Sequence, residues 1–222
     1  NSINVKVRRI GGGFGGKETQ SFLFAAISSI AAKKLNRPVK LRIDRDDDMI
    51  MTGKRHPFIF KYEVGFSNNG KINGLKILMA SNCGISADLS GAINDRAIYH
   101  IDNAYFIPNL ELTSHRCKTN TVSNTAFRGF GGPQGMFCIE NIIDCISHPL
   151  NKEPSNVRVQ NFYKKNLNNI THYGMKIEDN IIEELFNNLK NKSNYTKRKK
   201  EIQKFNKSNS ILKKGIAITP VK

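Results

Sequence analysis

Near its start the chain reads INVKVRRIGGGFGGKETQSFLFAAISSIAAKKL (residues 3–35). Residues 3–10 alternate loosely between apolar and polar side chains, which predicts a strand. A glycine-rich turn follows at Gly11–Gly16, and apolar residues at helical spacing then predict a helix over 17–35. A strand, a glycine-rich turn and a helix in succession indicate a mixed α/β fold of the α+β class.

The rest of the chain continues this mixture. An extended segment over 39–44 ends in an acidic cluster, and two strands over 58–66 and 71–79 are joined by a Ser-Asn-Asn-Gly turn typical of a hairpin. Residues 80–125 are expected to be irregular with short strands. A second glycine-rich turn, AFRGFGGPQG (126–135), leads into an amphipathic helix over 136–146. Helices are further expected over 154–164 and 178–192, and a strand begins within 215–222.

Length and composition set the class of protein. With 222 residues, 39% of them hydrophobic, the chain can bury an ordinary core, which excludes a disordered or collagen-like protein. It contains neither an apolar run of membrane-spanning length nor a recognisable signal peptide. The chain lacks an initiator Met and both ends fall in strand-like runs, so we expect a fragment truncated at both ends.

The net charge of +17 is concentrated in a Lys-rich segment, residues 189–214, which we expect to be helical or a loop. Such a balance is compatible with a polyanion-binding module. A run of positive charge does not by itself provide groups that recognise bases, and few aromatic residues lie within this segment. A solvated helix face is the simpler interpretation, and no nucleic-acid or membrane partner is expected.

The cysteines and histidines point to no metal site. Four cysteines lie far apart without a C-x-x-C pair, as expected for free thiols in a reducing, cytoplasmic compartment. The five histidines show no metal-ligand spacing and are expected to be structural.

The glycine-rich turns are the candidate binding elements. The pattern Gly11-x-Gly13-x-x-Gly16 formally matches a dinucleotide fingerprint, but the acidic residue required about 20 positions later is missing. Glycines at the start of a helix let backbone amides approach an anion, and Glu18 could equally be a routine partner of the helix dipole. In the second turn Arg128 stands among aromatic residues, which suits a flat, electron-rich ligand or, more simply, a structural turn.

Five stretches carry a resemblance to a known family. They are RIGGGFGGKET (9–19), NRPVKLR (36–42), DRDDDMIMTGKRHPF (44–58), SADLSGAINDRA (86–97) and CKTNTVSNTAFRGFGGPQGM (117–136). On these stretches the chain resembles the molybdenum-cofactor-binding large subunit of bacterial molybdenum hydroxylases, the xanthine dehydrogenase/aldehyde oxidase family. The resemblance implies that residues 1–222 are the N-terminal portion of a molybdopterin-binding domain.

The resemblance also implies an activity. Family members hydroxylate an electron-poor carbon with oxygen from water, using a molybdenum–molybdopterin cofactor and a buried glutamate as general base. Electrons leave through 2Fe–2S clusters to FAD and then NAD. The iron–sulfur and FAD groups are expected on a small partner subunit, in a heterotetramer. No residue of this chain matches the general base, so the isolated chain is expected to be inactive.

Site residues follow from the resemblance position by position. Phe14 and Gly15 match the turn beside the molybdenum, and Arg128 matches a cofactor contact, with Phe14 and Arg128 placed near the metal through their backbones. Glu18 and Arg96 match the pair that binds a purine from opposite sides, and Phe130 matches an aromatic residue that packs on its ring.

Three alternatives to this interpretation stay open at this point. An aldehyde oxidase-type enzyme generally lacks the Glu/Arg pair, so the presence of Glu18 and Arg96 favours hypoxanthine and xanthine, oxidised to urate in purine catabolism. The chain could instead be a nonfunctional gene remnant. Without the resemblance, Arg96 beside Asp95 would be interpreted as half of a surface ion pair.

Overall fold

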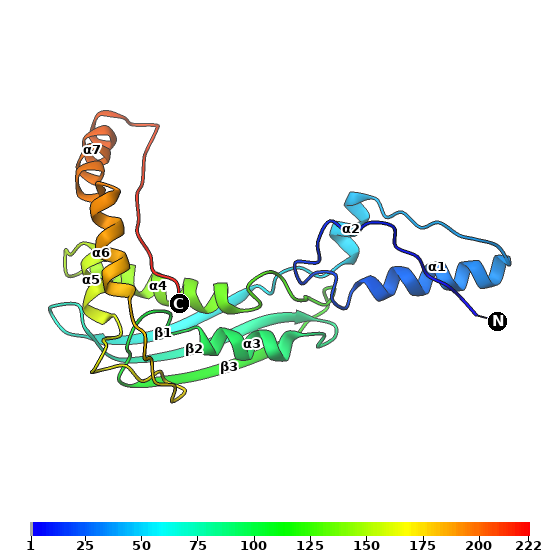
Figure 1. Cartoon of the computed structure of the whole chain (residues 1–222), viewed down its shortest axis with the longest axis horizontal. Coiled ribbons are helices and arrows are strands. Elements are labelled where there is room, and N and C mark those ends of the chain that lie inside the picture. The colour runs from blue at the N-terminus through cyan, green and yellow to red at the C-terminus, as the bar shows by residue number, and fades with distance from the viewer. Residues whose placement is uncertain (1) are drawn as a thin grey trace. The chain divides into compact units, whose positions relative to one another are not determined.

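The structure, a computed structural model, describes residues 2–222 (Figure 1). The elements over this range are α1 (Ser21–Leu35), α2 (Arg45–Met51), β1 (Phe58–Phe66), β2 (Ile72–Gly84), α3 (Ser90–Tyr99), β3 (Leu110–Lys118), α4 (Gly132–Ser147), α5 (Pro154–Asn161), α6 (Ile182–Lys192) and α7 (Tyr195–Ser208). The mixed helix-and-strand class predicted from the sequence is confirmed.

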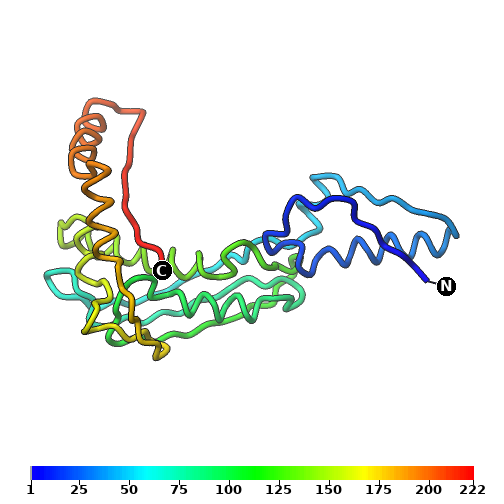
Figure 2. The backbone as a smooth tube through the Cα atoms, viewed as in Figure 1, coloured from blue at the N-terminus to red at the C-terminus, as the bar shows by residue number. Residues whose placement is uncertain are grey.

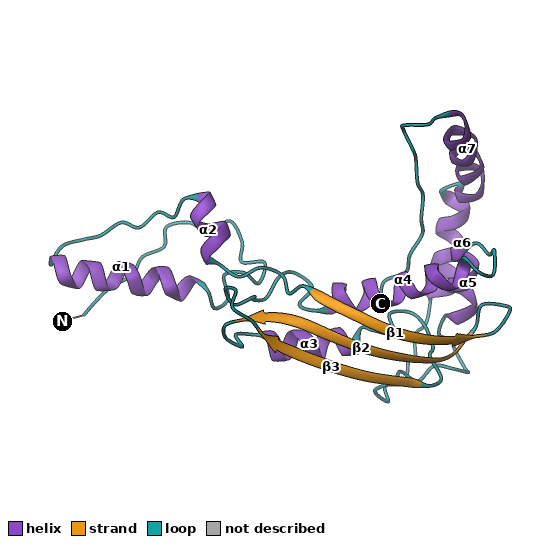
Figure 3. Ribbon diagram, turned by 180° about the vertical axis from the view of Figure 1, so that it is seen from behind, coloured by secondary structure: helices purple, strands orange, loops and turns teal. Residues whose placement is uncertain are grey.

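The strands form a sheet in the order β1-β2-β3, which Figure 3 shows from behind. The predicted hairpin is confirmed: the Ser67 amide donates to the Lys71 carbonyl over 2.9 Å, and Gly70 has a positive φ of 92°. A residue with a side chain would be strained at that φ. β2 and β3 run in the same direction, and α3 connects them.

Contacts divide the described chain into two compact units, and each strand contributes residues to both. Unit 1 comprises the chain up to Lys61, Leu78–Ile98 and Thr113–Gln134, and unit 2 comprises Tyr62–Ile77, Tyr99–Leu112 and Gly135–Lys222. Unit 1 contains α1, α2, nearly all of α3, the first glycine-rich turn and the second one up to Gln134. Unit 2 contains most of α4 and all of α5, α6 and α7.

The core of unit 2 is built on α4. Four isoleucines, Ile139, Ile142, Ile143 and Ile146, are almost fully buried, and their spacing places them on one helix face. This confirms the amphipathic helix predicted over 136–146, although the helix begins earlier, at Gly132. The ring of Phe162, which follows α5, stacks against Tyr105 in the same core.

A buried ion network joins α4 to α5. The Arg158 side chain, 3% exposed, donates through Nε to Glu140 Oε2 over 2.8 Å and through an Nη to Asp144 Oδ1 over 2.9 Å. Tyr105 Oη also donates to Glu140, over 2.5 Å. Because the guanidinium lies between two carboxylates, neither the cation nor Glu140 is left unpaired out of water.

Within unit 2 the last residues run from α7 back to the residues that follow α3, as the tube in Figure 2 shows. Lys222 Nζ donates to the buried Asp102 carboxylate over 2.6 Å, and Tyr163 Oη donates to the same oxygen over 2.6 Å. Asn103 Nδ2 donates to the Pro220 carbonyl over 2.9 Å. Burial alone would raise the pKa of Asp102, but hydrogen bonds from His172, Lys222 and Tyr163 outweigh burial and lower this pKa below its ordinary value.

Two predicted strands are wrong. Residues 3–10 and 215–222 form no strand, since the chain from 2 to 222 places no ladder partner beside them. The alternating side chains Ile3, Val5 and Val7 are consequently exposed. Helix α1 was correctly predicted, although it begins at Ser21, and none of its residues is buried.

Residues 80–125 are more regular than predicted, since β2 extends to Gly84 and both α3 and β3 lie in this range. The α3 sequence contains Gly91, Asn94 and Asp95, which are poor helix formers. Burial of Ile93 and Ala97, together with a hydrogen bond from Asn94 Nδ2 to Ser81 Oγ of 2.8 Å, overrides that propensity.

The later helices are shorter than predicted: α5 ends at Asn161 and α6 begins at Ile182. The Lys-rich segment 189–214 contains the end of α6, all of α7 and an extended stretch. All four cysteines are free thiols, as predicted, and burial raises the pKa of Cys138 to about 12. None of the helices that the structure describes combines the length and apolar character needed to cross a bilayer.

Replacing Arg158 tests the ion network. Arg158→Met leaves Glu140 buried without its cation, so we expect the free energy of unfolding to fall by about 3–5 kcal/mol. Urea unfolding followed by circular dichroism measures it. The double variant Arg158→Met/Glu140→Gln should recover part of the loss, and a double variant as unstable as the single one would contradict this account.

The Asp102 carboxylate predicts acid sensitivity. Because the pKa of Asp102 is lower in the folded state, the ionised carboxylate stabilises the protein at pH values above the unfolded-state pKa of about 3.9. This contribution to the free energy of unfolding is lost as the pH falls through the folded-state pKa. The urea midpoint should therefore fall more steeply below about pH 4 in the wild type than in Asp102→Asn. Asp95→Asn, an exposed position, is the control and should keep the wild-type slope.

Candidate functional site

The first glycine-rich turn has an unusual backbone. Gly12, Phe14 and Gly15 have positive φ angles of 111°, 50° and 90°. A phenylalanine in the left-handed region is a strained conformation, of a kind that clusters at binding and active sites. Lys17 Nζ closes the turn by donating to the Gly12 carbonyl over 2.8 Å.

The amides of this turn are available to a ligand. Within residues 2–222, no backbone amide from Gly11 to Lys17 donates a hydrogen bond. A Cβ added at Gly11, Gly13 or Gly16 would meet no atom within 4 Å, so one side of the turn is open. Free amides around an open turn before a helix are suited to an anionic group.

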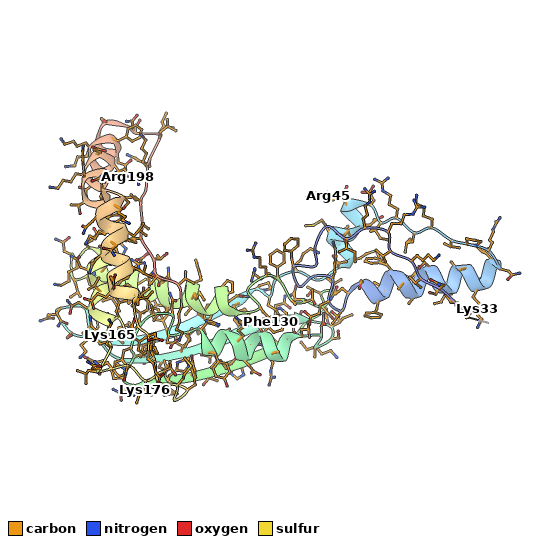
Figure 4. All side chains as sticks on the ribbon, in the orientation of Figure 1. Lys33, Arg45, Phe130, Lys165, Lys176 and Arg198 are labelled. Carbon is orange, nitrogen blue, oxygen red and sulfur yellow. The ribbon has the colours of Figure 1, made fainter. Side chains whose placement is uncertain are left out.

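The second turn also places a phenylalanine in the left-handed region. Gly129, Phe130 and Gly131 have positive φ angles of 96°, 50° and 99°, and Phe130 is labelled in Figure 4. The Phe130 amide donates to the Phe127 carbonyl over 2.8 Å. The turn then passes directly into α4, whose first residue is Gly132. Each turn therefore presents one phenylalanine from a left-handed position between glycines.

Glycines bring the two turns and α3 into contact. A Cβ on Gly15 would lie 2.8 Å from the Ala126 carbonyl carbon, so the first turn packs directly on the backbone of the second. Gly131 packs in the same way on α3, where a Cβ would collide with the Ile93 carbonyl. Three stretches that are distant in sequence therefore converge, and they carry Glu18, Arg96 and Arg128.

Asp88 connects these stretches through side chains. Its carboxylate accepts hydrogen bonds from Thr19 Oγ1 over 2.9 Å and from Gln20 Nε2 over 3.0 Å. Gln20 Nε2 also donates to the Ser123 carbonyl over 3.0 Å, and Gln20 Oε1 accepts from the Gly53 amide over 2.7 Å. The residues just after Glu18 are thereby held to the start of α3 and to the approach to the second turn.

The predicted site side chains lie mostly in the open. Glu18, Arg96 and Arg128 are exposed, Phe14 is 61% exposed, and Phe130 is half-buried. Arg96 has no ion pair within residues 2–222, so the surface-pair alternative is wrong. Exposed charged side chains that have no partner among the described residues are free to bind a polar ligand.

Sequence reasoning missed Arg55 as a site residue. Its Nη2 donates to the Arg128 carbonyl over 2.6 Å, and its guanidinium lies 4.6 Å from the centre of the Phe127 ring. Arg55 therefore fixes the backbone of the second turn. The resemblance over 44–58 included this residue, but only the structure shows where its side chain points.

The neighbouring His56 has a structural role. It is buried, and its Nε2 lies 2.7 Å from Ser90 Oγ at the start of α3. Burial lowers the pKa of His56 and outweighs the opposing charge of Asp88, so the imidazole is neutral at pH 7. This agrees with the prediction that the histidines are structural.

Known proteins resemble the whole of this region. Residues 1–162 match the family of molybdopterin cofactor-binding domains. Xanthine dehydrogenase/oxidase of Gallus gallus is 46% identical over 222 residues, which is 100% of this chain and 16% of that protein. Xanthine dehydrogenase 1 of Arabidopsis thaliana is 46% identical over 220 residues, 99% of this chain and again 16% of the relative.

A solved structure supports the same assignment. The aldehyde oxidoreductase of Desulfovibrio desulfuricans superposes with a TM-score of 0.77 at 27% identity, covering 87% of this chain and 21% of that chain. The chain therefore spans about a sixth to a fifth of the length of these proteins.

Two glycines of the first turn give a matched test of the turn contact. Gly15→Ala adds a Cβ against the Ala126 backbone at a positive φ, so we expect the free energy of unfolding to fall by about 1–3 kcal/mol. Gly13→Ala adds the same atom in open space and should change it by less than about 0.5 kcal/mol. Urea unfolding compares the two, and equal effects would contradict the packing described here.

Proposed function

Because the chain belongs to the molybdopterin cofactor-binding domain family, we propose that it is part of a molybdenum-dependent hydroxylase of the xanthine dehydrogenase type. The proposed reaction hydroxylates hypoxanthine and xanthine to urate with oxygen from water. The observation that carries the proposal is the convergence of the free amides of Gly11–Lys17 with the segments that bear Arg96 and Arg128. The high identity to xanthine dehydrogenases over the full chain supports the substrate class.

The residues present fit the cofactor. Among the residues that the structure describes, no three His, Cys, Asp or Glu side chains gather where they could hold a metal. The open turn instead offers backbone amides, which suit an anionic organic cofactor that carries its own metal. Phe14 and Gly15 would hold that group through the first turn, and Arg128 through the second. When bound, the cofactor supplies the centre that oxidises the substrate.

The chain's own side chains position the purine. Glu18 forms a hydrogen bond with a ring nitrogen of the purine. Arg96 stabilises negative charge that develops on a purine carbonyl oxygen. Phe130 packs on the flat ring. The contacts of Asp88 with Thr19 and Gln20 keep the stretch that bears Glu18 against the start of α3. Arg55 holds the turn that presents Phe130 and Arg128.

The charged rim favours a purine over an aldehyde. An aldehyde offers no groups that could satisfy both Glu18 and Arg96, and polar groups left unpaired around a bound substrate reduce its affinity. Similarity to the Desulfovibrio desulfuricans aldehyde oxidoreductase supports a shared scaffold, and keeps aldehyde oxidation as the second candidate.

The remaining assignments concern the whole protein. We propose that 2Fe–2S clusters and FAD receive the electrons, that NAD is the final acceptor, and that the enzyme works in the cytoplasm. An iron–sulfur and FAD subunit in a heterotetramer would supply these groups. The relatives are several times longer than this chain, so the same groups could equally belong to one long polypeptide.

Exchanging the charged pair tests the substrate assignment. In the full enzyme, Glu18→Val with Arg96→Met should lower kcat/KM for xanthine by roughly 100-fold or more, because two charged contacts to the purine are lost. Turnover of an aromatic aldehyde should persist or rise. Steady-state kinetics with both substrates, together with the molybdenum content, measures this.

A matched control removes a charged pair elsewhere. Lys76→Met with Glu111→Gln abolishes an exposed ion pair between β2 and β3 and should leave both activities unchanged. Unchanged xanthine kinetics in the Glu18/Arg96 variant, with full molybdenum content, would refute the roles assigned here. Loss of both activities with loss of molybdenum would show a structural role instead.

A further inference from the structure

Helices α6 and α7 form a basic groove far along the chain from the glycine-rich turns. The groove has a volume of about 610 Å³, and four lysines line it: Lys190, Lys197, Lys200 and Lys204. The other lining residues are Asn191, Asn194, Thr196 and Glu201. All of these residues belong to unit 2, and Figure 4 marks α7 by Arg198.

Helical spacing places the lysines in a row. Lys197, Lys200 and Lys204 are separated by three and four residues, so they share one face of α7. At 1.5 Å per residue, successive ammonium groups start about 4.5–6 Å apart along the axis. Lys190, near the end of α6, adds a fourth positive charge to the same groove. Glu201 is the one carboxylate among the described lining residues, so positive charge predominates.

Some lysines of this segment have an internal partner, and the four groove lysines do not. Lys199 pairs with Glu153, Lys213 donates to the Asn206 and Asn209 carbonyls, and Lys214 lies over the Phe205 ring. By contrast, Lys190, Lys197, Lys200 and Lys204 make no side-chain hydrogen bond or ion pair within residues 2–222. Their charges are therefore available to a ligand.

A second hollow extends this surface. It has a volume of about 350 Å³ and shares Lys190 with the first groove. Lys152, Val159 and the amide side chains of Asn69, Asn156, Gln160 and Asn187 also line it. The two hollows, which share Lys190, form a mostly polar path of lysines and amides.

The chemistry of this path fits a chain of phosphates. Lysines neutralise phosphate charges, and amide side chains donate hydrogen bonds to phosphate and sugar oxygens. The described lining of the first groove includes no apolar side chain, which an anionic lipid surface would require for insertion. Tyr195 is buried, so this groove offers no aromatic ring for base stacking.

We propose that the α6–α7 groove binds the phosphate backbone of nucleic acid without base specificity. This function is separate from the catalytic proposal, since it uses none of the residues of the glycine-rich turns. It also departs from the expectation, drawn from the sequence, of no nucleic-acid partner. The charge run alone did not show that four lysines face one groove without partners.

Fluorescence anisotropy with the full chain tests the proposal. The probes are labelled thymidine and uridine homopolymers of about 20 nucleotides, titrated at several salt concentrations. Lys197→Gln/Lys200→Gln/Lys204→Gln should weaken binding at least tenfold and lower the log–log salt slope by about 2. Replacing the same lysines by arginine should preserve binding.

The control removes equal charge elsewhere. Lys33→Gln/Lys34→Gln/Lys40→Gln, all at exposed positions, should change the affinity less than twofold. Circular dichroism confirms that each variant is folded. Equal losses in both triple variants, or no binding by the wild type, would overturn the proposal.

Competitors distinguish other polyanions. Displacement of the probe by inorganic polyphosphate, polyglutamate or phosphatidylserine vesicles at lower charge concentration than by unlabelled homopolymer would assign the groove to that ligand and reject nucleic acid.

Discussion

The contact between the backbones at Gly15 and Ala126 is the constraint on which the candidate site depends. Any side chain at Gly15 would separate the two glycine-rich turns, and any side chain at Gly131 would push the second turn off α3. With those separations the stretches bearing Glu18, Arg96 and Arg128 would no longer share one surface. The hydrogen bonds around Asp88 reinforce this arrangement but could not create it, because they require the backbones to be close already.

The same glycines allow two phenylalanines to occupy left-handed positions. Such a conformation costs of order 1–3 kcal/mol for a residue with a side chain. In the second turn the strained residue stands between two glycines with positive φ, and in the first turn Gly15, which follows Phe14, also has a positive φ. The structure therefore concentrates strain at Phe14 and Phe130, one in each glycine-rich turn.

Local sequence patterns correctly predicted the helices and strands whose turn residues or apolar spacing identify them. They failed for segments whose secondary structure is determined by tertiary contacts. The hairpin at Ser67–Gly70 and helix α4 have turn chemistry and apolar spacing that identify them locally. Helix α3 was missed because its sequence is a poor helix former and its stability comes from Ile93 and Ala97. The run over 3–10 was predicted as a strand from alternation, but alternation does not supply a partner strand.

The site was predictable in part. The glycine-rich turns were identified from their composition, and the roles predicted for Glu18 and Arg96 came from the resemblance to a family. Arg55 and Asp88 act through contacts between residues 68 to 73 positions apart, which no local pattern contains. Likewise, the lysine run was visible in the sequence, but its division into paired and unpaired ammonium groups depends on where Glu153 and the Phe205 ring lie.

The open apolar surface of α1 has a consequence for the colloidal behaviour of the chain. Phe22 and Ile30 are each more than two-thirds exposed, and such side chains attract one another in water. At low ionic strength the net charge of +17 keeps copies of the chain apart. Salt at 0.1 M shortens the range of that repulsion to about 10 Å and leaves the apolar attraction intact. Added salt therefore favours self-association through α1. It also lowers the affinity of the α6–α7 groove for an anionic ligand.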